Sequence, residues 1–500
     1  MTFLRNYVRR HPIRTKRFLE ILPGFVSWSM ILFPIWGSFV VPQLVAYYII
    51  IFSVYWLYRS ITLAVLSVSA FFTIKASSAY DWVGELKQKF PKKYKQVHHL
   101  IIIPTYKEPL KTLDKTLHSL TQQTIPLKNL HIMISFEERE GKPAKEKAKK
   151  LLKKYQHQFG HLMATFHPDI EGEVKGKSSN TAWGARQAKK ILVDQEKMNL
   201  NYLTVTSEDA DARFHPSYFA NITFEFLSLD KPYNVVWQGA VMFYNNIWEV
   251  PAPVRVMASM FSVFQMYILK RADRLVNFST YTTTLKHVVE IDYWDTDVIP
   301  EDYRLFFKSF FAKKGEFYVR PIFLPIYADA AQANGFWATM VNQYEQLKRW
   351  AWGVSDDAYI IKMFILSEDI PFHKKFIRVL KTVEDHFLWP VNWFAVTVAA
   401  FFPTLLNPHF SRTALGHNLS QVTSTLLTLS LVSMFVIFII DALSRPAKPD
   451  GRSILSYITQ PLEFILLPII GFFFSALPGI DAHTRLMLGK YIEYRVTEKV

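Results

Sequence analysis

The sequence predicts an α/β domain with a doubly wound, Rossmann-like sheet, inserted between membrane-spanning helices. Half of the 500 residues are hydrophobic, and these are concentrated in the first 76 and the last 115 positions. Residues 77–320 have the composition of a globular domain, so we expect a membrane protein with a large soluble insert. Within this insert, short apolar runs alternate with helical stretches, as in a sheet whose parallel strands are connected by helices.

The N-terminal part, residues 1–80, is predicted to hold a basic segment, two transmembrane helices and an interfacial helix. Residues 20–40 and 41–58 each approach the roughly 20 residues that a spanning helix needs. Arg59 stands where the second helix is expected to reach the membrane surface. The next piece, 60–75, is either a third span or a helix lying on the surface. Basic residues on both sides of this region favour the cytoplasm, so two crossings are favoured.

The C-terminal part, residues 386–480, is predicted to hold about three transmembrane helices, followed by a tail at 481–500. Residues 386–406 and 418–440 have the length and hydrophobicity of spans. The last apolar stretch, 454–480, contains prolines and a glutamate, so it either crosses once or turns back. The side of the membrane on which the tail lies depends on this alternative.

The formal net charge of +16 has two interpretations, binding to nucleic acid or apposition to anionic lipid and anionic substrate. Because basic residues flank the predicted spans, the membrane interpretation is favoured, and no nucleic acid is expected as a partner. The chain has no Cys. This excludes disulfides, thiolate nucleophiles and Cys-based zinc sites.

The soluble insert, residues 95–320, is predicted to alternate strands with helices. Ligands of such sheets bind at the carboxyl ends of the strands, so polar residues that follow an apolar run are candidates for a site. The predicted strands lie at 100–103, 130–135, 162–166 and 202–206, and the predicted helices lie at 110–123, 142–159 and 178–193.

Asp209 and Asp211 follow the strand predicted at 202–206. Two Asp residues two apart at an extended chain end can share a divalent cation, and their hard oxygen atoms suit Mg²⁺ or Mn²⁺ bridging a diphosphate. The alternative is a solvated turn or a helix-capping carboxylate. The position after a strand end favours the metal site.

A lysine stands at the start of the third predicted helix, in Gly176-Lys177-Ser178-Ser179-Asn180. A lysine together with backbone N–H groups at a helix start favours a phosphate. The segment lacks the spacing of a P-loop. The alternative is a plain N-cap by Ser178 or Ser179.

The acidic pair Glu301-Asp302 precedes an apolar helix predicted at 305–311. One carboxylate is expected to cap that helix. The other can take the proton from an acceptor hydroxyl as the hydroxyl attacks the anomeric carbon of a sugar, which is the role of a general base in an inverting transfer.

Residues 321–385 are predicted to form interfacial helices that carry a QxxRW motif. Positions i, i+3 and i+4 of a helix share a face, so Gln346, Arg349 and Trp350 point the same way. A guanidinium can hold a departing diphosphate, an amide can hydrogen-bond to sugar or phosphate, and an indole can stack on a sugar ring. The alternative is an interfacial anchor, since Trp and Arg also mark the lipid–water boundary.

In their order along residues 97–354, these motifs resemble those of the membrane-integrated family-2 glycosyltransferases. This group includes cellulose, hyaluronan and chitin synthases and ceramide glucosyltransferase. Pro104-Thr105-Tyr106-Lys107-Glu108 resembles the first-strand P-x-Y-x-E, where the nucleotide base is held. Residues 176–180 resemble the family's Lys-x-x-Asn element, 209–211 its metal-binding DxD, 301–302 its E-D pair with the Asp as base, and 346–350 its QxxRW.

One element departs from the family pattern. The second strand of the family ends in an Asp that contacts the base, whereas here the strand runs into Glu137-Glu138-Arg139-Glu140. Glu137 or Glu138 is expected to take the place of that Asp. The nucleotide, uridine or guanosine, is therefore left open, with a UDP-sugar favoured.

The resemblance implies a GT-A fold, an inverting and metal-dependent hexosyl transfer, and an active site in the cytoplasm at the plasma (inner) membrane. It assigns Asp302 as the catalytic base and Asp209 and Asp211 as ligands of Mg²⁺ or Mn²⁺. The expected partners are a nucleotide-sugar donor, a glycan or lipid acceptor, the bilayer, and membrane or envelope proteins that the sequence does not identify. The donor-binding residues that it implies are Thr105, Tyr106, Glu108, Glu137, Lys177, Gln346, Arg349 and Trp350.

A catalytically inactive membrane scaffold and a transporter are the alternatives to an enzyme. A transporter is expected to show ionisable residues within its spans and two matching halves. Only Glu463 approaches the first feature, and no two halves match. An inactive scaffold is expected to have lost one of the motifs, and all of them are present. The sequence leaves open the sugar, the linkage, processivity, the oligomeric state, and whether the product is a polymer or a glycolipid.

Overall fold

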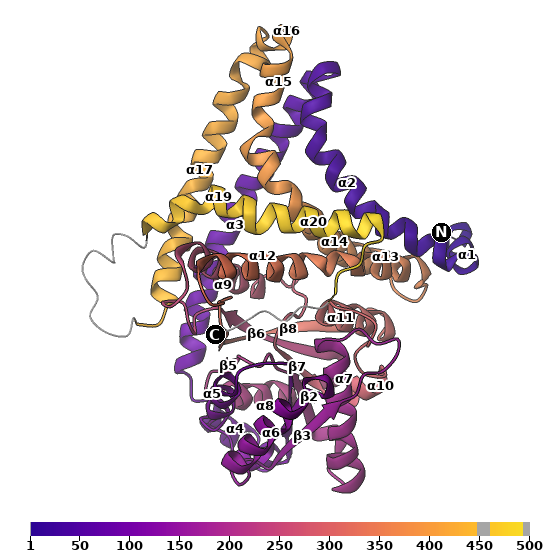
Figure 1. The fold of residues 1–500 in the computed structure, drawn as a ribbon, viewed down its shortest axis with the longest axis vertical. Coiled ribbons are helices and arrows are strands. Elements are labelled where there is room, and N and C mark those ends of the chain that lie inside the picture. Colours follow the sequence, from indigo (N-terminus) through magenta and orange to yellow (C-terminus); the bar gives the residue numbers. More distant parts are fainter. Residues whose placement is uncertain (1, 448–460, 494–500) are drawn as a thin grey trace.

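The computed structural model describes residues 2–447 and 461–493 and has two parts. A globular α/β part forms one end of the molecule (Figure 1). Helices α2 (Pro12–Val40), α3 (Pro42–Ala79) and α17 (Ala414–Ser444) extend from it to the opposite end. Helices α12 (Phe336–Ala351), α13 (Asp357–Leu366), α19 (Leu467–Gly471) and α20 (Leu477–Leu488) lie across, between the globular part and the extended helices (Figure 1).

Eight strands form one mixed sheet in the order β3-β2-β1-β4-β7-β6-β8-β5. Strands β1 to β4 run parallel, β7 is antiparallel to both of its neighbours, and β6 pairs parallel with β8. The carboxyl ends of β1, β2, β3, β4, β6 and β8 therefore meet at one edge. The strands are β1 (His98–Thr105), β2 (Leu130–Glu137), β3 (His161–His167), β4 (Leu203–Ser207), β5 (Arg213–Phe214), β6 (Val235–Met242), β7 (Tyr281–Thr284) and β8 (Tyr318–Tyr327).

This sheet confirms the predicted α/β fold class, with a Rossmann-like parallel half, inserted between apolar helices of both chain ends. The four predicted strands are β1 to β4, and the three predicted helices are α5, α6 and α7. The sheet continues to Tyr327, beyond the boundary at residue 320 that the sequence suggested. The helices of this part are α4 (Trp82–Lys89), α5 (Leu110–Leu120), α6 (Lys142–Tyr155), α7 (Lys177–Lys189), α8 (Tyr218–Ser228), α9 (Ala252–Leu269), α10 (Leu285–Glu290) and α11 (Glu301–Ala312).

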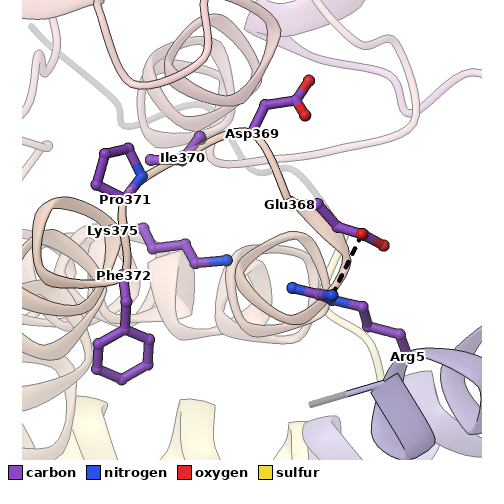
Figure 2. A pocket seen from close by; sticks show the side chains of 7 residues that line it. All are labelled: Arg5, Glu368, Asp369, Ile370, Pro371, Phe372 and Lys375. Atoms are coloured by element: carbon purple, nitrogen blue, oxygen red, sulfur yellow. Dashed lines mark ion pairs between the residues drawn. The ribbon is translucent and has the colours of Figure 1, made fainter.

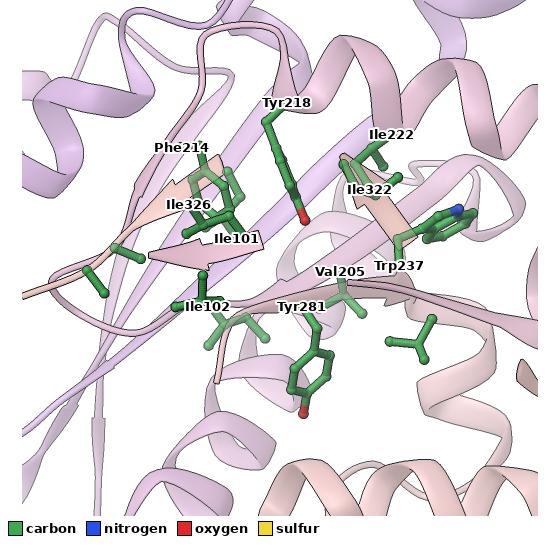
Figure 3. Packing of buried hydrophobic residues seen from close by; sticks show 14 of the residues in the cluster. Ile101, Ile102, Val205, Phe214, Tyr218, Ile222, Trp237, Tyr281, Ile322 and Ile326 are labelled. Atoms are coloured by element: carbon green, nitrogen blue, oxygen red, sulfur yellow. The ribbon is translucent and has the colours of Figure 1, made fainter. Parts of the chain in front are cut away.

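Apolar side chains cover both faces of the sheet, as the continuous apolar runs predicted. Ile101 and Ile102 are both fully buried, and as successive residues of a strand they point to opposite faces (Figure 3). Tyr218 of α8 is buried among the residues on one face (Figure 3). On the other face, a Cβ on Gly184 of α7 would come within 3.0 Å of Ile102 and 3.1 Å of Ser135. The glycine therefore lets α7 approach the strands closely.

Five helices of the described chain are long and apolar enough to cross a membrane: α2, α3, α9, α17 and the helical segment 461–488. A further candidate is the pair formed by α14 (Phe372–Thr397) and residues 399–406, which is bent by 46°. By length and composition, the chain is therefore membrane-associated. Helix α9 stands apart because 61% of its apolar window is buried, where it packs on β6 and against α3.

The pieces predicted at 41–58 and 60–75 form one continuous helix, α3, instead of a span followed by a third span or a separate interfacial helix. No Pro or Gly interrupts residues 43–79. Arg59 does not end the helix, because its guanidinium lies 3.0 Å from Asp385 Oδ1 and donates to Tyr55 Oη at 3.1 Å. A charge that looked like a boundary is thus neutralised by a distant part of the chain.

The last predicted apolar stretch, 454–480, is described only from residue 461 onward. Its helices α19 (Leu467–Gly471) and α20 (Leu477–Leu488) lie across the bases of the extended helices (Figure 1). Helix α20 packs against α2, with Trp28 Nε1 donating to Thr484 Oγ1 at 2.9 Å. The tail predicted at 481–500 therefore begins inside α20. The remaining helices are α1 (Thr2–Arg10), α12 (Phe336–Ala351), α13 (Asp357–Leu366), α15 (Phe402–Leu406) and α16 (Pro408–Ser411).

Candidate active site

The carboxyl edge of the sheet gathers residues that are far apart in the sequence. Strand β1 ends at Thr105 and β2 ends at Glu137, while Asp209 and Asp211 follow β4. Lys177 is the first residue of α7. The doubly wound topology therefore brings these predicted site residues to the place where such sheets bind their ligands.

Lys177 joins two predicted motifs directly. Its Nζ lies 2.7 Å from Asp209 Oδ1 and 2.9 Å from Glu301 Oε1, and it also donates to the carbonyl oxygen of Ser279. Burial by itself lowers the pKa of Lys177, but the two carboxylates outweigh it, so the pKa lies above its ordinary value. The side chain is therefore a fixed cation between the DxD and the acidic pair.

Glu301 is the more buried member of the acidic pair, with 4% of its surface exposed. Its Oε2 accepts a hydrogen bond from Tyr281 Oη at 3.0 Å, while its Oε1 faces Lys177. Burial raises the pKa of Glu301 to about 7, although Lys177 opposes the shift. This carboxyl group is enclosed by Lys177 and Tyr281.

Asp302 is half-buried and is held by two backbone N–H groups. Its Oδ1 accepts from Tyr303 N at 2.9 Å, and its Oδ2 accepts from Ser279 N at 3.1 Å. Burial raises the pKa of Asp302, and the opposing effects of Lys177 and of these two N–H groups leave it above its ordinary value. The carboxylate is therefore fixed in orientation and keeps part of its surface open.

The helix-capping role expected for one of these carboxylates takes a different form in the structure. The N-cap position of α11 is Pro300, and no side chain caps the helix there. Glu301 is drawn away from the helix end by Lys177, and Asp302 instead accepts a first-turn N–H, that of Tyr303.

Asp209 and Asp211 differ in exposure. The Asp209 side chain is 30% exposed, and its Oδ2 accepts a hydrogen bond from Ser279 Oγ. Asp211 is 2% exposed, and its Oδ2 accepts from Asp329 N at 2.7 Å. The backbone carbonyl of Asp211 accepts from Asn245 Nδ2 at 3.1 Å. Asp209 is therefore the aspartate whose carboxylate is the more accessible to a ligand.

The chemistry of this pair fits a divalent cation. Asp209 Oδ1 already lies 2.7 Å from a positive charge, the Lys177 ammonium. Within residues 2–447 and 461–493, no three His, Asp or Glu side chains are grouped so that they hold a metal ion. A magnesium or manganese ion held by Asp209 and Asp211 would thus take its other ligands from phosphate and water.

The ends of β1 and β2 form a second part of the edge. Thr105 Oγ1 is buried and has no hydrogen-bond partner in the described part of the chain. The Arg139 guanidinium pairs with Glu137 and stacks over the Tyr106 ring, with 3.9 Å between Cζ and the ring centroid. Glu108 is buried, and its carbonyl oxygen accepts from Lys147 Nζ at 2.8 Å. A small pocket beside Glu137 is lined by Arg139, His167, Pro168, Asp169, Ile170, Glu173, Lys175 and Ser179.

The QxxRW motif lies on α12. Trp350 contacts Phe243, which directly follows β6, with 5.6 Å between ring centroids. It also meets Phe261 of α9 edge to face, at 5.1 Å and 90°. Gln346 is buried on the same helix. Strand β6 runs in the same direction as β4, so Phe243 and its neighbour Trp350 lie at the carboxyl edge of the sheet. Trp350 packs against these aromatic rings, whereas Trp337 at the start of α12 is 78% exposed.

Several residues of this edge were not predicted from the sequence. Ser279 contacts Asp209, Asp302 and Lys177, and Tyr281 contacts Glu301. Asp329 follows β8 and binds Asp211 through its backbone. An Asp after an apolar strand was a usable signal, but Ser279 and Tyr281 carry no charge or spacing that marks them.

A larger groove, of about 480 Å³, lies away from this edge and is lined by Arg5, Glu368, Asp369, Ile370, Pro371, Phe372 and Lys375 (Figure 2). Arg5 is paired with Glu368 at 3.3 Å, and its Nε donates to the carbonyl oxygen of Ile365. Lys375 Nζ donates to the carbonyl oxygens of Phe364 and Ser367. The cations of the groove thus bind the last carbonyls of α13, which is a structural role.

No protein-family model and no curated protein matches the chain. Among solved structures, it is similar to the mannosyltransferase PcManGT from Pyrobaculum calidifontis, in complex with GDP-Man and Mn²⁺. The identity is 13%, the TM-score is 0.42, and the match covers 75% of this chain and 99% of that one.

It is also similar to residues 1–349 of TarS from S. aureus in complex with UDP-GlcNAc, at 12% identity and a TM-score of 0.34 over 80% of this chain and 93% of that one. A third structure, GalNAc-T7 with UDP, GalNAc and Mn²⁺, matches at 13% identity and a TM-score of 0.31 over 61% of this chain and 56% of that one. All three TM-scores are low, so the function is inferred from the arrangement of the side chains.

Proposed function

We propose that the chain is a membrane-bound, inverting glycosyltransferase of the family-2 type, which moves a sugar from a nucleotide-sugar to an acceptor presented at the membrane. One observation carries the proposal. Lys177 joins Asp209 and Glu301, so a strand end, a helix start and the acidic pair converge at the carboxyl edge of the sheet. These groups supply what a sugar transfer needs, a cation-binding carboxylate, a fixed positive charge and a general base.

On the donor side, the chain's residues would bind the nucleotide and orient its diphosphate. Mg²⁺ or Mn²⁺ on Asp209 and Asp211 would neutralise charge on the diphosphate. Lys177 and Arg349 provide cations for the same group. The pocket that includes Glu137, together with Thr105, Tyr106 and Glu108 at the end of β1, would hold the base and ribose. The buried Oγ1 of Thr105 offers an unused hydrogen-bonding group there.

On the acceptor side, Asp302 would act as the general base. As the acceptor oxygen forms its bond to the anomeric carbon, the bond from that carbon to the diphosphate breaks. The acceptor proton passes to Asp302, and the nucleoside diphosphate leaves with the electron pair. Asp302 suits this role better than Glu301, because Glu301 is enclosed by Lys177 and Tyr281 whereas Asp302 is half-open. Gln346 and Trp350 would hold the sugar from α12, with the indole stacking on its ring.

The candidate spans support a site close to a membrane, which we propose is the plasma (inner) membrane with the α/β domain in the cytoplasm. The acceptor would then be a growing glycan or a lipid. In this arrangement α12, α13, α19 and α20 would lie in the interface plane, between the α/β domain and the extended helices (Figure 1).

The test is to supply purified, reconstituted protein with labelled UDP- and GDP-sugars and Mn²⁺, with the Asp302→Asn variant as control. We expect transfer by the wild type, and at least a 100-fold loss in the variant with unchanged donor affinity, since general bases contribute about 10²–10⁴-fold. Label in the organic phase would identify a glycolipid synthase, and label in insoluble material a polymer synthase. Normal turnover by the variant would refute Asp302 as the base, and binding of donors without transfer by the wild type would contradict the proposed function.

A further inference from the structure

The segment Arg274–Thr280, between α9 and β7, touches the membrane-side helices at one end and the candidate catalytic carboxylates at the other. We call this segment the strap. Residues 274 to 277 and Thr280 are buried, while Phe278 and Ser279 are half-buried. A short buried segment with both ends held has little freedom to move independently of either neighbour.

The first end of the strap is held by charges on α14 and α3. The Arg274 side chain is 2% exposed, and its guanidinium lies 2.7 Å from Asp385 and 2.9 Å from Glu384. Asp385 is shared with Arg59 of α3, at 3.0 Å. Arg378 of α14 adds a hydrogen bond to the carbonyl oxygen of Leu275 at 2.9 Å. Charged residues of α14 and α3 thus fix where the strap begins.

The second end of the strap reaches the acidic groups through Ser279. Its N–H donates to Asp302 Oδ2 at 3.1 Å, its Oγ donates to Asp209 Oδ2, and its carbonyl oxygen accepts from Lys177 Nζ. One step earlier, Asn277 Nδ2 donates to the backbone carbonyl of Asp302 at 3.1 Å. A single residue therefore binds the proposed base, the proposed metal ligand and the cation between them.

Ser279 makes these contacts from an unusual backbone conformation. Its φ is +53°, in the left-handed region that residues other than Gly, Asn and Asp seldom adopt. Such a conformation persists where the surroundings determine it, here three polar contacts and a buried strap. It turns the N–H toward Asp302 while the side chain faces Asp209.

We infer that Ser279 is a positioning residue, and that the strap sets the orientation of Asp302 relative to Asp209 by tying both to α14 and α3. This inference rests on the proposed function and extends it to residues outside the predicted motifs. The seven residues of the strap join the helices that would present an acceptor to the carboxylates that would act on it. The strap therefore fixes the position of these carboxylates relative to the helices.

The experiment compares Arg274→Gln with Arg271→Gln in the full-length, reconstituted protein. Arg271 belongs to the same loop, but it pairs with Asp273 at 2.7 Å and with Tyr267 Oη at 2.9 Å, and neither of these partners belongs to α14. We expect Arg274→Gln to lower kcat at least tenfold while the donor Kd stays within twofold. Arg274→Lys should restore most of the rate, and Arg271→Gln should behave like the wild type.

Ser279→Ala is the second arm and is needed if Arg274→Gln does not fold. It removes the Oγ that donates to a proposed metal ligand, and loss of such outer hydrogen bonds costs about 10–100-fold in metal affinity or activity. We therefore expect Mn²⁺ affinity, measured by direct titration without turnover, to fall about tenfold. A wild-type kcat in Arg274→Gln together with wild-type Mn²⁺ binding in Ser279→Ala would overturn the proposed role of the strap. Equal losses of kcat in Arg271→Gln and Arg274→Gln would also overturn it.

The Asp302→Asn variant separates this test from that of the proposed function. If Asp302→Asn turns over normally, Asp302 is not the base and the strap has no base to position. If Asp302→Asn is inactive while the strap variants match the wild type, only the strap is wrong.

Discussion

Glu301 makes the stability of the protein depend on pH in a direction opposite to that of most carboxylates. Burial raises its pKa from 4.5 to about 7, so the folded protein binds the proton more tightly than the unfolded chain does. The stability that the protonated group confers is complete below pH 4.5 and is lost as the pH rises through 7. Glu301→Gln keeps the shape of the side chain but cannot ionise, so it should remove this dependence.

The size of the effect follows from the two pKa values. With 4.5 in the unfolded chain and about 7 in the folded protein, ionisation of Glu301 costs about 1 kcal/mol at pH 5 and about 3.5 kcal/mol at pH 8. The stability of Glu301→Gln relative to the wild type should therefore increase by about 2.5 kcal/mol between these pH values.

The assay is the thermal unfolding midpoint of purified wild type and variant at pH 5, 6, 7 and 8. We expect the gap between the two Tm values to widen with pH by on the order of a few °C. Glu316→Gln is a matched control, because Glu316 is 56% exposed and pairs with Lys231 on the surface. If Tm falls in parallel for the wild type and Glu301→Gln, then Glu301 is not a buried, proton-binding group and the reasoning fails.

Two further predictions address the metal and the opposite edge of the sheet. Changing Asp209 and Asp211 to Ala together should remove both the Mn²⁺ dependence and most of the donor affinity. A nucleotide-sugar titration of the variant with and without Mn²⁺ measures both, and a titration unchanged from that of the wild type would contradict the site. His131 bonds His98 at 3.0 Å and His161 at 2.9 Å, and burial lowers the pKa of His131 from 6.5 to about 3. The unfolded chain therefore binds the proton more tightly than the folded protein does. The contribution of neutral His131 to the free energy of unfolding should be complete above pH 6.5 and be about 2 kcal/mol smaller at pH 5. The acid unfolding curve of His131→Gln should lack this loss.

The strands that carry the site could be predicted from the sequence because burial on both faces leaves a local signal. Strands β1 and β2 contain continuous apolar runs, β4 is buried along its whole length, and polar residues that follow these strands mark their carboxyl ends. Asp209 and Asp211 were found in this way and Lys177 from its place at a predicted helix start, and the structure brings Asp209 and Lys177 together. Local patterning was sufficient wherever the burial of a residue decided its type.

Helix α3 and Asp302 show where the local signal fails. Arg59 reads as the end of a span because a lone charge is costly in lipid, but Glu384 and Asp385, far along the chain, neutralise it and the helix continues. The acidic pair is symmetrical in the sequence. Lys177 and Tyr281 enclose Glu301, and backbone N–H groups orient Asp302, so only packing separates their roles.

By itself, the sequence determined an α/β sheet between apolar helices, the edge that we propose binds its ligand, and the carboxylates, lysine and QxxRW residues that lie there. Only the tertiary structure decided that Lys177 bridges two motifs, that Asp302 is the half-open carboxylate, and that Ser279 binds both proposed catalytic groups. The physical reason is that periodicity and burial are properties of neighbours in the chain. Hydrogen bonds, ion pairs and a left-handed φ at Ser279 depend on residues that meet only in the fold.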